Sequence, residues 1–349
     1  MPEVKSHRSQ WVDIAKAISI LLVVFHHSSF SFTPAMMTLD EVLLFFRMPL
    51  FFFASGLFLS KMMRYDFPAL VGRRLAPLLY LYVIWSVVKW AAVTGLPYLR
   101  GQEVDLANVL HIFWEPPATL WFIYALALYS LFAWLLRKLP VAFVAAAAFV
   151  ASALALSVGP VTDGPFALRI ARFFLWFWLG YALRDHTAAL IKQHFRWPLL
   201  LVVPLWGWTC YHLSTSGADL HIWALPLTAS ALLAGLVLAG ALERTSLSRP
   251  LAALGRNTLP IYVAHFFPLM LLSGQFASQF LAPSWFAALF SMILAVTFSY
   301  AAKLIADQVG LGWIYELPQS AREGIELRMG GMKRRATKIT DAGGLESKS

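Results

Sequence analysis

Three ionisable side chains share one apolar segment near the start of the chain, and their spacing suits chemistry. Asp13, Lys16 and His27 stand in the stretch DIAKAISILLVVFHH. If this stretch is helical, eleven steps of about 100° place Lys16 and His27 on one face, roughly 16 Å apart along the axis. Asp13 precedes Lys16 by three residues, so the two charges can pair. The pattern predicts a path that holds an anionic compound at Lys16 while chemistry takes place near His27.

The same residues also admit a purely structural explanation. Lys16 can extend its amine to the membrane surface, and His27 can bond a neighbouring helix. Ionisable groups inside a bilayer are costly, however, and two of them on one face beside Asp13 favour a functional role. His26 points about 100° away from His27, so we expect it to support the site or to pack.

Composition identifies the environment in which this segment must lie. Of the 349 residues, 59% are hydrophobic and 13% are charged, and the mean hydropathy is +0.66. Soluble domains carry about 25% charged residues, because their outside needs polar cover. These values exclude a soluble enzyme, a disordered chain and a disulfide scaffold, and they predict an all-α, polytopic membrane protein.

Net charge and the cysteine count narrow the class further. The formal net charge is +10, but the basic residues flank apolar runs, so membrane orientation explains them and no nucleic-acid partner is expected. The single cysteine, Cys210, lies in an apolar run and allows neither an internal disulfide nor a cysteine-based metal cage. We expect an inert buried thiol, and no metal is implied.

Apolar stretches of about 20 residues, the length of a membrane-spanning helix, recur along the chain. Ten transmembrane helices are predicted, at 12–32, 41–60, 70–94, 118–137, 140–158, 168–184, 197–215, 222–242, 257–274 and 285–306. The third is long enough to be tilted or broken, and the sixth is short enough to need residues from its flanks. The first resembles a signal peptide, but its charges and the lack of a small-residue cleavage site predict a retained helix.

Basic residues alternate between the two sides of these spans. With the N-terminus in the cytoplasm, most of the 28 Lys and Arg residues fall on the cytoplasmic side. The exceptions are Arg47, Lys89, Arg100, Arg169 and Arg172. The alternation predicts that both termini are cytoplasmic, with a short N-terminal segment (1–11), a membrane domain (12–306) and a basic cytoplasmic tail (307–349).

Further candidate residues follow the first helix. In RMPLFFFASGLF (47–58), Arg47 near the outer end could pair with an acidic group or contact a substrate. Ser55 and Gly56 suit the close approach of another helix, and Ser55 could also line a channel. Arg73 and Arg74 stand at the cytoplasmic mouth of the third span, where they suit phosphates but also act as topology signals.

Two residues later in the chain are weaker candidates. Glu115, in an outer loop, could contact an acceptor, although polar loop residues commonly have no specific partner. His265 lies about halfway along the ninth span, where a lone histidine most often bonds a neighbouring helix.

Six segments, taken in order, resemble the acyltransferase 3 family of integral membrane O-acyltransferases. They are DIAKAISILLVVFHH (13–27), PLFFFASGLFL (49–59), RRLAPLLYLY (73–82), LWFIYAL (120–126), FFLWFWLGYAL (173–183) and LGRNTLPIYVAH (254–265). The ordered set extends over nearly all of residues 12–306. Lys16 and His27 fit the family signature of a basic residue, ten intervening residues and a histidine. Lys16 stands where Arg is commoner, and Lys cannot make the bidentate phosphate contact of Arg.

The resemblance implies an enzyme that carries acyl groups across the bacterial inner membrane. Family members transfer an acyl group from cytoplasmic acyl-CoA to hydroxyls of glycans on the outer side. For this chain the group is expected to be acetyl, and the acceptor an extracytoplasmic or lipid-linked glycan such as exopolysaccharide or O-antigen. The chain resembles the stand-alone members, and the RMPLFFFASG form is most similar to the fucose and exopolysaccharide O-acetylase branch.

The resemblance also implies roles for the candidate residues. Lys16, Arg73 and Arg74 would bind the phosphates of acyl-CoA, which is a donor substrate and not a bound cofactor. His27 would act as a general base, or alternatively carry a transient acyl group. The supporting or acceptor-side candidates are Asp13, Arg47, Ser55, Glu115 and His265. The expected partners are acyl-CoA, the glycan and membrane lipids.

Two other classes are compatible with part of the pattern. A transporter of an anionic solute would use Lys16 and His27 as a binding and proton-relay pair. It explains the spans equally well, but not the ordered segments, and no inverted repeat is apparent. A non-catalytic membrane scaffold would not need the buried charges.

The topology can be tested with reporter fusions. Fusions after Asp105, Asp219 and Gln275 should report the outer side, and fusions after Arg64, Arg137 and Arg249 should report the cytoplasm, because basic residues are retained inside. Inverted signals at two or more of these sites would contradict both the topology and the cytoplasmic binding of the donor.

Overall fold

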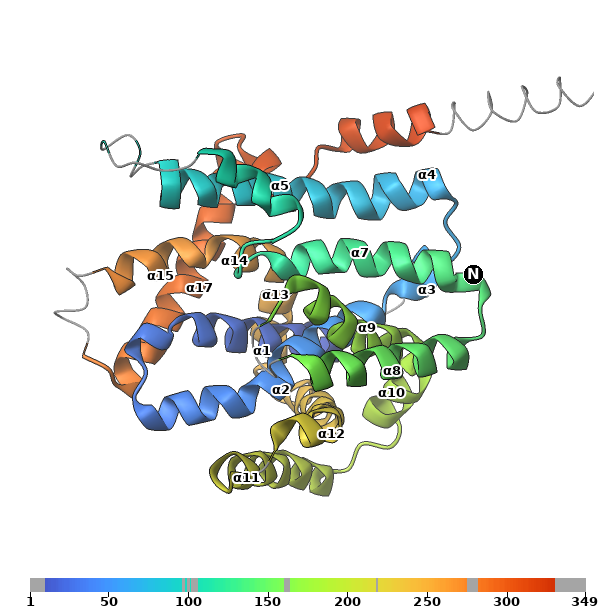
Figure 1. The fold of residues 1–349 in the computed structure, drawn as a ribbon, viewed down its shortest axis with the longest axis vertical. Coiled ribbons are helices and arrows are strands. Elements are labelled where there is room, and N and C mark those ends of the chain that lie inside the picture. The colour runs from blue at the N-terminus through green and yellow to red at the C-terminus, as the bar shows by residue number, and fades with distance from the viewer. Residues whose placement is uncertain are drawn as a thin grey trace, which may run out of the picture. The chain divides into compact units, whose positions relative to one another are not determined.

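The computed structural model describes residues 10–95, 98, 101, 106–159, 164–217, 219–274 and 282–329. Every regular element in these ranges is helical, so the predicted all-α class is confirmed (Figure 1). Residues 1–9, Arg100 and residues 330–349 of the predicted basic tail lie outside the described residues.

A helix occupies each of the predicted spans. In chain order they are α1 (Gln10–His27), α2 (Pro34–Gly56), α4 (Phe67–Leu70) with α5 (Ala76–Trp90), α7 (Trp121–Leu135), α8 (Val141–Val158), α9 (Phe166–Ala182), α11 (Val202–Thr215), α12 (Leu220–Leu242), α14 (Thr258–Ala264) with α15 (Phe266–Ser273), and α17 (Trp285–Gln308). The shorter elements are η1 (Ser29–Ser31), α3 (Leu59–Met62), η2 (Val71–Leu75), η3 (Ala91–Gly95), η4 (Leu106–Phe113), η5 (Leu136–Lys138), α10 (Arg184–Lys192), η6 (Trp197–Leu201), α13 (Ser248–Arg256), η7 (Gly312–Ile314) and a helix over 319–329.

Four helical segments among the described residues are long and apolar enough to cross a membrane. They are Phe67–Gly95, Val141–Val158, Trp223–Leu242 and Trp285–Gln308. A fifth is present if α9 and α10, which are bent by 66° at their junction, form one broken span. The other predicted spans are helical but too short or too polar to meet the same criteria. The count of ten spans and the cytoplasmic placement of both termini therefore stay predictions.

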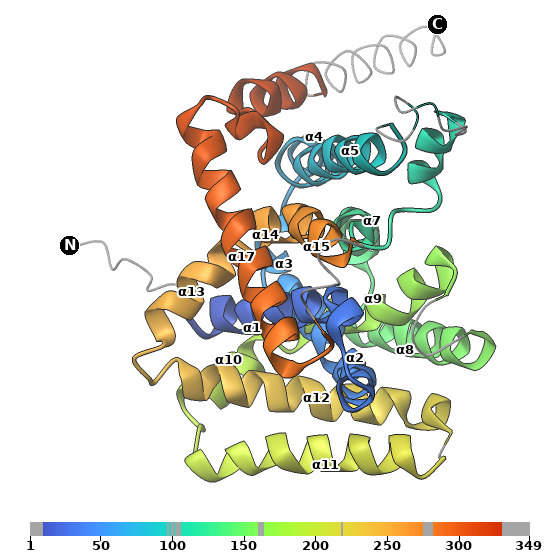
Figure 2. The same ribbon diagram turned by 90° about the vertical axis from the view of Figure 1, so that its left-hand side faces the viewer.

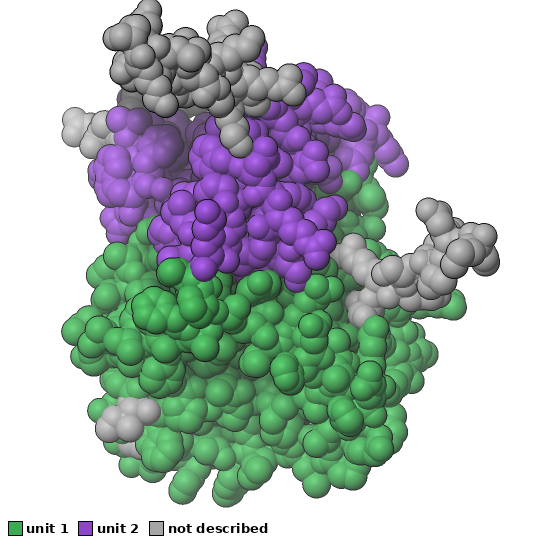
Figure 3. All heavy atoms as spheres, turned by 90° about the vertical axis from the view of Figure 1, so that its right-hand side faces the viewer, with its two compact units in different colours: residues 1–58, 139–305 green, residues 59–138, 306–349 purple. Residues whose placement is uncertain are grey.

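The chain folds as two compact units, each built from two separated segments (Figure 3). The first unit comprises residues 1–58 and 139–305, and the second comprises 59–138 and 306–349. Lys16, His27 and His265 belong to the first unit, whereas Arg73 and Arg74 belong to the second.

Helix α1 lies in the core of the first unit. It packs against α2, α12, α13 and α14. Its residues Ile14, Ala15, Ala17, Ile20 and Val24 are completely buried, and they are spread around the helix. Helix α2 packs on α9, α8 pairs with α9, and α11 runs alongside α12 (Figure 2). Close packing on several sides holds α1 in one rotation, which a polar site on its surface requires.

The second unit is organised by the packing of α5 on α7. The hydroxyl of Tyr80 donates to the carbonyl oxygen of Trp313 at 3.0 Å, and the indole nitrogen of Trp85 donates to that of Ile314 at 2.8 Å. These two bonds attach the C-terminal η7 to α5. The π-helical turns η2 and η3 lie within the continuous helix Phe67–Gly95, at the two ends of α5.

Two helix crossings in the first unit bring backbones into contact and therefore require glycine. A methyl group at Gly56 of α2 would overlap the carbonyl oxygen of Phe177 on α9, and a methyl group at Gly180 would overlap that of Phe53. At the second crossing, a methyl group on Gly255 of α13 would overlap the carbonyl oxygen of Asp13. The close approach expected at Gly56 is therefore present.

We expect Gly180→Ala to destabilise the protein by about 1–3 kcal/mol, because the added methyl group forces α2 and α9 apart. Gly207→Ala in α11 is the matched control, since a methyl group there meets no atom within 4 Å. This control should be neutral or slightly stabilising, because alanine favours helix over glycine. Thermal unfolding in detergent gives both values. A Gly180→Ala protein as stable as the wild type would contradict the backbone contact.

Candidate active site

A buried carboxylate near the start of α1 lies between two cations. Asp13 is 1% exposed, and its Oδ1 lies 3.4 Å from the Nζ of Lys16. Its Oδ2 lies 4.0 Å from the Nη1 of Arg256, the last residue of α13. The Asp13–Lys16 pair predicted from the spacing is therefore present. The carboxylate of Asp13 therefore lies near one cation from its own helix and one from α13, and Glu243 accepts a hydrogen bond from the backbone N–H of Trp11 nearby.

Packing brings Arg256 into this cluster. Gly255 allows α13 to contact the backbone of α1 at Asp13, and the next residue then reaches the carboxylate. The side chain of Arg256 is 48% exposed, whereas that of Lys16 is 15% exposed. In the sequence, Arg256 is one of the many basic residues on the predicted cytoplasmic side. Its place directly after the glycine of LGRN is the signal that could have found it.

The other end of α1 carries imidazole rings in contact. The ring centroids of His26 and His27 are 4.9 Å apart, and those of His27 and His265 are 5.1 Å apart. His265 is completely buried, while His26 and His27 are partly exposed. The partly exposed ring of His27 can contact a substrate while the buried ring of His265 holds it in position. This arrangement suits His27 for proton transfer.

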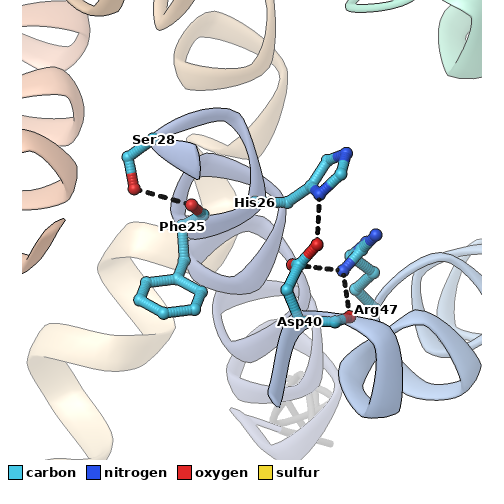
Figure 4. Close-up of polar contacts among 5 residues, drawn as sticks. All are labelled: Phe25, His26, Ser28, Asp40 and Arg47. Carbon is cyan, nitrogen blue, oxygen red and sulfur yellow. Dashed lines mark hydrogen bonds and ion pairs between the residues drawn. The ribbon is translucent and has the colours of Figure 1, made fainter. Parts of the chain in front are cut away.

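A carboxylate on α2 joins His26 to Arg47 (Figure 4). The Oδ2 of Asp40 lies 2.8 Å from the Nδ1 of His26, and the Oδ1 accepts a hydrogen bond from the Nη1 of Arg47 at 2.7 Å. The same Nη1 donates to the backbone carbonyl of Asp40 at 3.0 Å. The pairing of Arg47 with an acidic group, one of its two predicted roles, is confirmed.

Asp40 is a site residue that the sequence analysis missed. The second span was predicted to begin at residue 41, but α2 begins at Pro34, because proline at the first position favours a helix start. Asp40 stands seven residues before Arg47, close to two full turns, so both lie on one helix face. That spacing is the signal that could have found it.

The carboxylate gives His26 a defined orientation. A carboxylate only accepts hydrogen bonds, so the Nδ1 of His26 carries the hydrogen and the ring is held as in other carboxylate–histidine pairs. At the same end of α1, the hydroxyl of Ser28 donates to the carbonyl oxygen of Phe25 at 2.6 Å and closes the helix (Figure 4). His26 therefore supports the cluster, in agreement with its expected role.

The remaining predicted site residues with charge lie in the second unit. Arg73 is 55% exposed, and its Nε and Nη2 donate to the two carboxylate oxygens of Glu326 at 3.0 and 3.1 Å. The Nε of Arg74 donates to the hydroxyl of Ser130 at 3.0 Å. Glu115 is exposed just after η4. The bidentate contact shows that Arg73 presents the planar fork that also fits phosphate.

Two serines of the first unit have different surroundings. The hydroxyl of Ser55 donates to the carbonyl oxygen of Phe51 within α2 at 2.8 Å, beside the glycine crossing. Ser19 is completely buried on α1 between Lys16 and His27, and within the described part of the chain its hydroxyl has no hydrogen-bond partner. Such a group is costly in a folded protein and calls for a partner. Ser19 is therefore a further candidate for contact with a bound molecule.

Metal ligation has no support among the residues that the structure describes. No group of three or more His, Cys, Asp or Glu side chains in these ranges is arranged to hold a metal ion. Cys210 is completely buried in α11, as predicted.

These features together define a class of protein. The chain is a multi-pass membrane protein whose core helix α1 has a group of charged side chains at one end and a group of histidines at the other. A family model described as an acyltransferase domain matches residues 9–304. The chain therefore belongs to the acyltransferase 3 family, and it is a membrane acyltransferase. No curated protein and no solved structure matches it.

Removing the charge of Asp40 should destabilise the protein. The side chains of Asp40 and Arg47 are only 15% and 7% exposed, so Asp40→Asn leaves a buried guanidinium without its carboxylate. Loss of one member of a buried pair costs on the order of 3–5 kcal/mol. We therefore expect a clearly lower melting temperature for Asp40→Asn.

The double variant Asp40→Asn, Arg47→Gln is the control for this prediction. It removes both charges, so it should recover part of the lost stability. A double variant whose loss equals the sum of the two single losses would show that the pair contributes no coupling energy.

Proposed function

We propose that this chain is an O-acetyltransferase of the bacterial inner membrane. It would move an acetyl group from cytoplasmic acetyl-CoA to a hydroxyl of an extracytoplasmic or lipid-linked glycan, such as exopolysaccharide or O-antigen. The observation that carries the proposal is the contact between His27 and the buried His265. His27 stands on α1, the helix that also carries Lys16. Family membership supports the transfer of an acyl group.

The chemistry at His27 is proton transfer. The neutral imidazole takes the hydrogen of the glycan hydroxyl while the hydroxyl oxygen attacks the thioester carbonyl. The resulting oxyanion collapses and the carbon–sulfur bond breaks. The imidazolium then returns its proton to the departing thiolate, so an ester and CoA thiol are formed and His27 is restored.

The cationic cluster at the start of α1 is proposed to bind the phosphates of CoA. Lys16 and Arg256 flank Asp13, and each of these two cations can attract a phosphate. The exposed guanidinium of Arg256 can offer the bidentate contact that Lys16 cannot. Arg256 therefore compensates for lysine at the position where the family usually has arginine.

The middle of α1 suits the extended arm of the donor. Lys16 and His27 are roughly 16 Å apart along the helix axis, of the order of the length of the pantetheine arm. Ser19 is buried between them, with a hydroxyl that has no partner in the described residues. An amide of the pantetheine arm would supply that partner.

Arg73 and Arg74 are proposed as further ligands of the donor phosphates. Arg73 is largely exposed and already holds a carboxylate in bidentate geometry. A phosphate would replace the carboxylate of Glu326 with the same two donors.

Transfer can proceed directly or through an acyl-imidazole on His27. In the direct reaction the hydroxyl attacks the thioester. In the stepwise reaction a neutral ring nitrogen of His27 attacks the thioester carbonyl and the carbon–sulfur bond breaks, which leaves an acetyl-imidazolium and a thiolate. The hydroxyl oxygen then attacks the acetyl group, the bond to the ring nitrogen breaks, and the hydroxyl proton passes to the thiolate. A labelled acetyl group on His27 in the absence of glycan would support the stepwise reaction.

The role of His27 can be tested with a matched pair of variants. Membranes that contain the protein are given labelled acetyl-CoA, and label in the glycan fraction is measured. His27→Ala should lose about 10²–10⁴-fold in rate, because the general base is gone. His26→Ala should lose much less activity, because His26 bonds Asp40 and can influence the reaction only through its contact with His27.

The outcomes separate the two function classes. Near wild-type transfer by His27→Ala would overturn the catalytic role of His27. Uptake of a labelled anionic solute without covalent transfer would instead match the transporter.

A further inference from the structure

His265 lies where two short helices of the first unit meet. Helix α14 ends at Ala264 and α15 begins at Phe266. Pro268 has no N–H with which to bond the carbonyl oxygen of Ala264, so the regular helix is interrupted beside His265. The interruption leaves the imidazole in contact with carbonyl oxygens of the preceding turn.

These contacts decide where the ring of His265 carries its hydrogen. Its Nδ1 lies 2.7 Å from the carbonyl oxygen of Tyr262 and 3.3 Å from that of Ile261. A carbonyl oxygen only accepts, so Nδ1 must be the donor. The neutral ring therefore has its lone pair on Nε2.

The ring of His265 lies within reach of His27. Their centroids are 5.1 Å apart, and the planes are tilted by 31°. An N–H···N hydrogen bond of about 2.9 Å between two imidazole nitrogens places the centroids roughly 5 Å apart. The separation therefore allows one nitrogen of His27 to give its hydrogen to the acceptor nitrogen of His265 with little movement of either helix.

We propose that His265 is the positioning residue of His27. Its Nε2 accepts the hydrogen from one ring nitrogen of His27, so that the other nitrogen is the base that meets the substrate hydroxyl. The hydrogen stays on His27 throughout. When the second nitrogen takes the hydroxyl proton, the bond to His265 becomes charge-assisted and stronger, which stabilises the imidazolium. The inference rests on the proposed function of His27.

Two variants of His265 separate this role from a structural one. In His265→Asn the side-chain amide nitrogen occupies the place of Nδ1, so the bond to the carbonyl of Tyr262 is kept and the acceptor towards His27 is lost. In His265→Gln the amide oxygen reaches the place of Nε2, so the acceptor is kept and the local bond is lost. If the role is structural, His265→Asn should be the more active variant. If His265 positions His27, His265→Gln should be the more active variant.

The experiment measures kcat and KM for acetyl-CoA in membranes that contain equal amounts of inserted protein. We expect His265→Asn to lower kcat by roughly 10- to 100-fold, as loss of an orienting partner does, with little change in KM. His265→Gln should retain most of kcat. The double variant His27→Ala, His265→Asn should be no slower than His27→Ala, because both changes remove the same step.

The outcomes distinguish the inference from the proposed function. The positioning role would be overturned, and the base at His27 left intact, by any of three results. These are equal losses of kcat in the two variants, a higher kcat in His265→Asn than in His265→Gln, or failure of both variants to insert. Full activity of His27→Ala would overturn the proposed function itself, and with it the inference.

Discussion

A charge on a helix that is buried from several sides must find its partner on that helix or on its neighbours, and this constraint organises the first unit. Asp13 is almost fully buried, and it is matched by Lys16 on its own helix and by Arg256 on α13. On α2, Asp40 is matched by Arg47 and by His26. An uncompensated charge at either place would cost several kcal/mol, so helix packing and charge pairing must form together.

The two clusters lie at opposite ends of α1, and apart from Ser19 the segment between them is apolar. Ile20, Val23 and Val24 are buried there, so water has little access along this part of the helix. A thioester carried past such residues would be shielded from hydrolysis until it reached an acceptor. In the proposed reaction, the donor phosphates bind at one end of this closely packed helix and the proton is transferred at the other.

The glycine crossings connect the fold to the site. Gly56 and Gly180 let α2 and α9 touch, which fixes the helix that carries Asp40 and Arg47. Gly255 lets α13 touch α1 at Asp13, which places Arg256. A side chain at these positions would push the helices apart, and the polar contacts between them would become too long. Small residues far from any reacting atom therefore decide whether the polar contacts can form.

The sequence by itself determined the helical class, the membrane environment, the family and the residues of α1. Hydropathy and the spacing of Asp13, Lys16 and His27 along a single helix are local properties, so they can be read without knowledge of the fold. The sequence predicts that Arg47 can pair with an acidic group but does not identify Asp40, because the predicted span begins at residue 41 whereas α2 begins at Pro34.

Only the tertiary structure decided which distant residues join α1. His265 and Arg256 are separated from their partners by more than two hundred residues, and neither spacing indicates a contact with α1. Their contacts depend on the glycine at the α13 crossing and on the interruption of helix beside Pro268. No periodicity along the chain encodes such contacts, because they arise from the way that separate helices pack against one another.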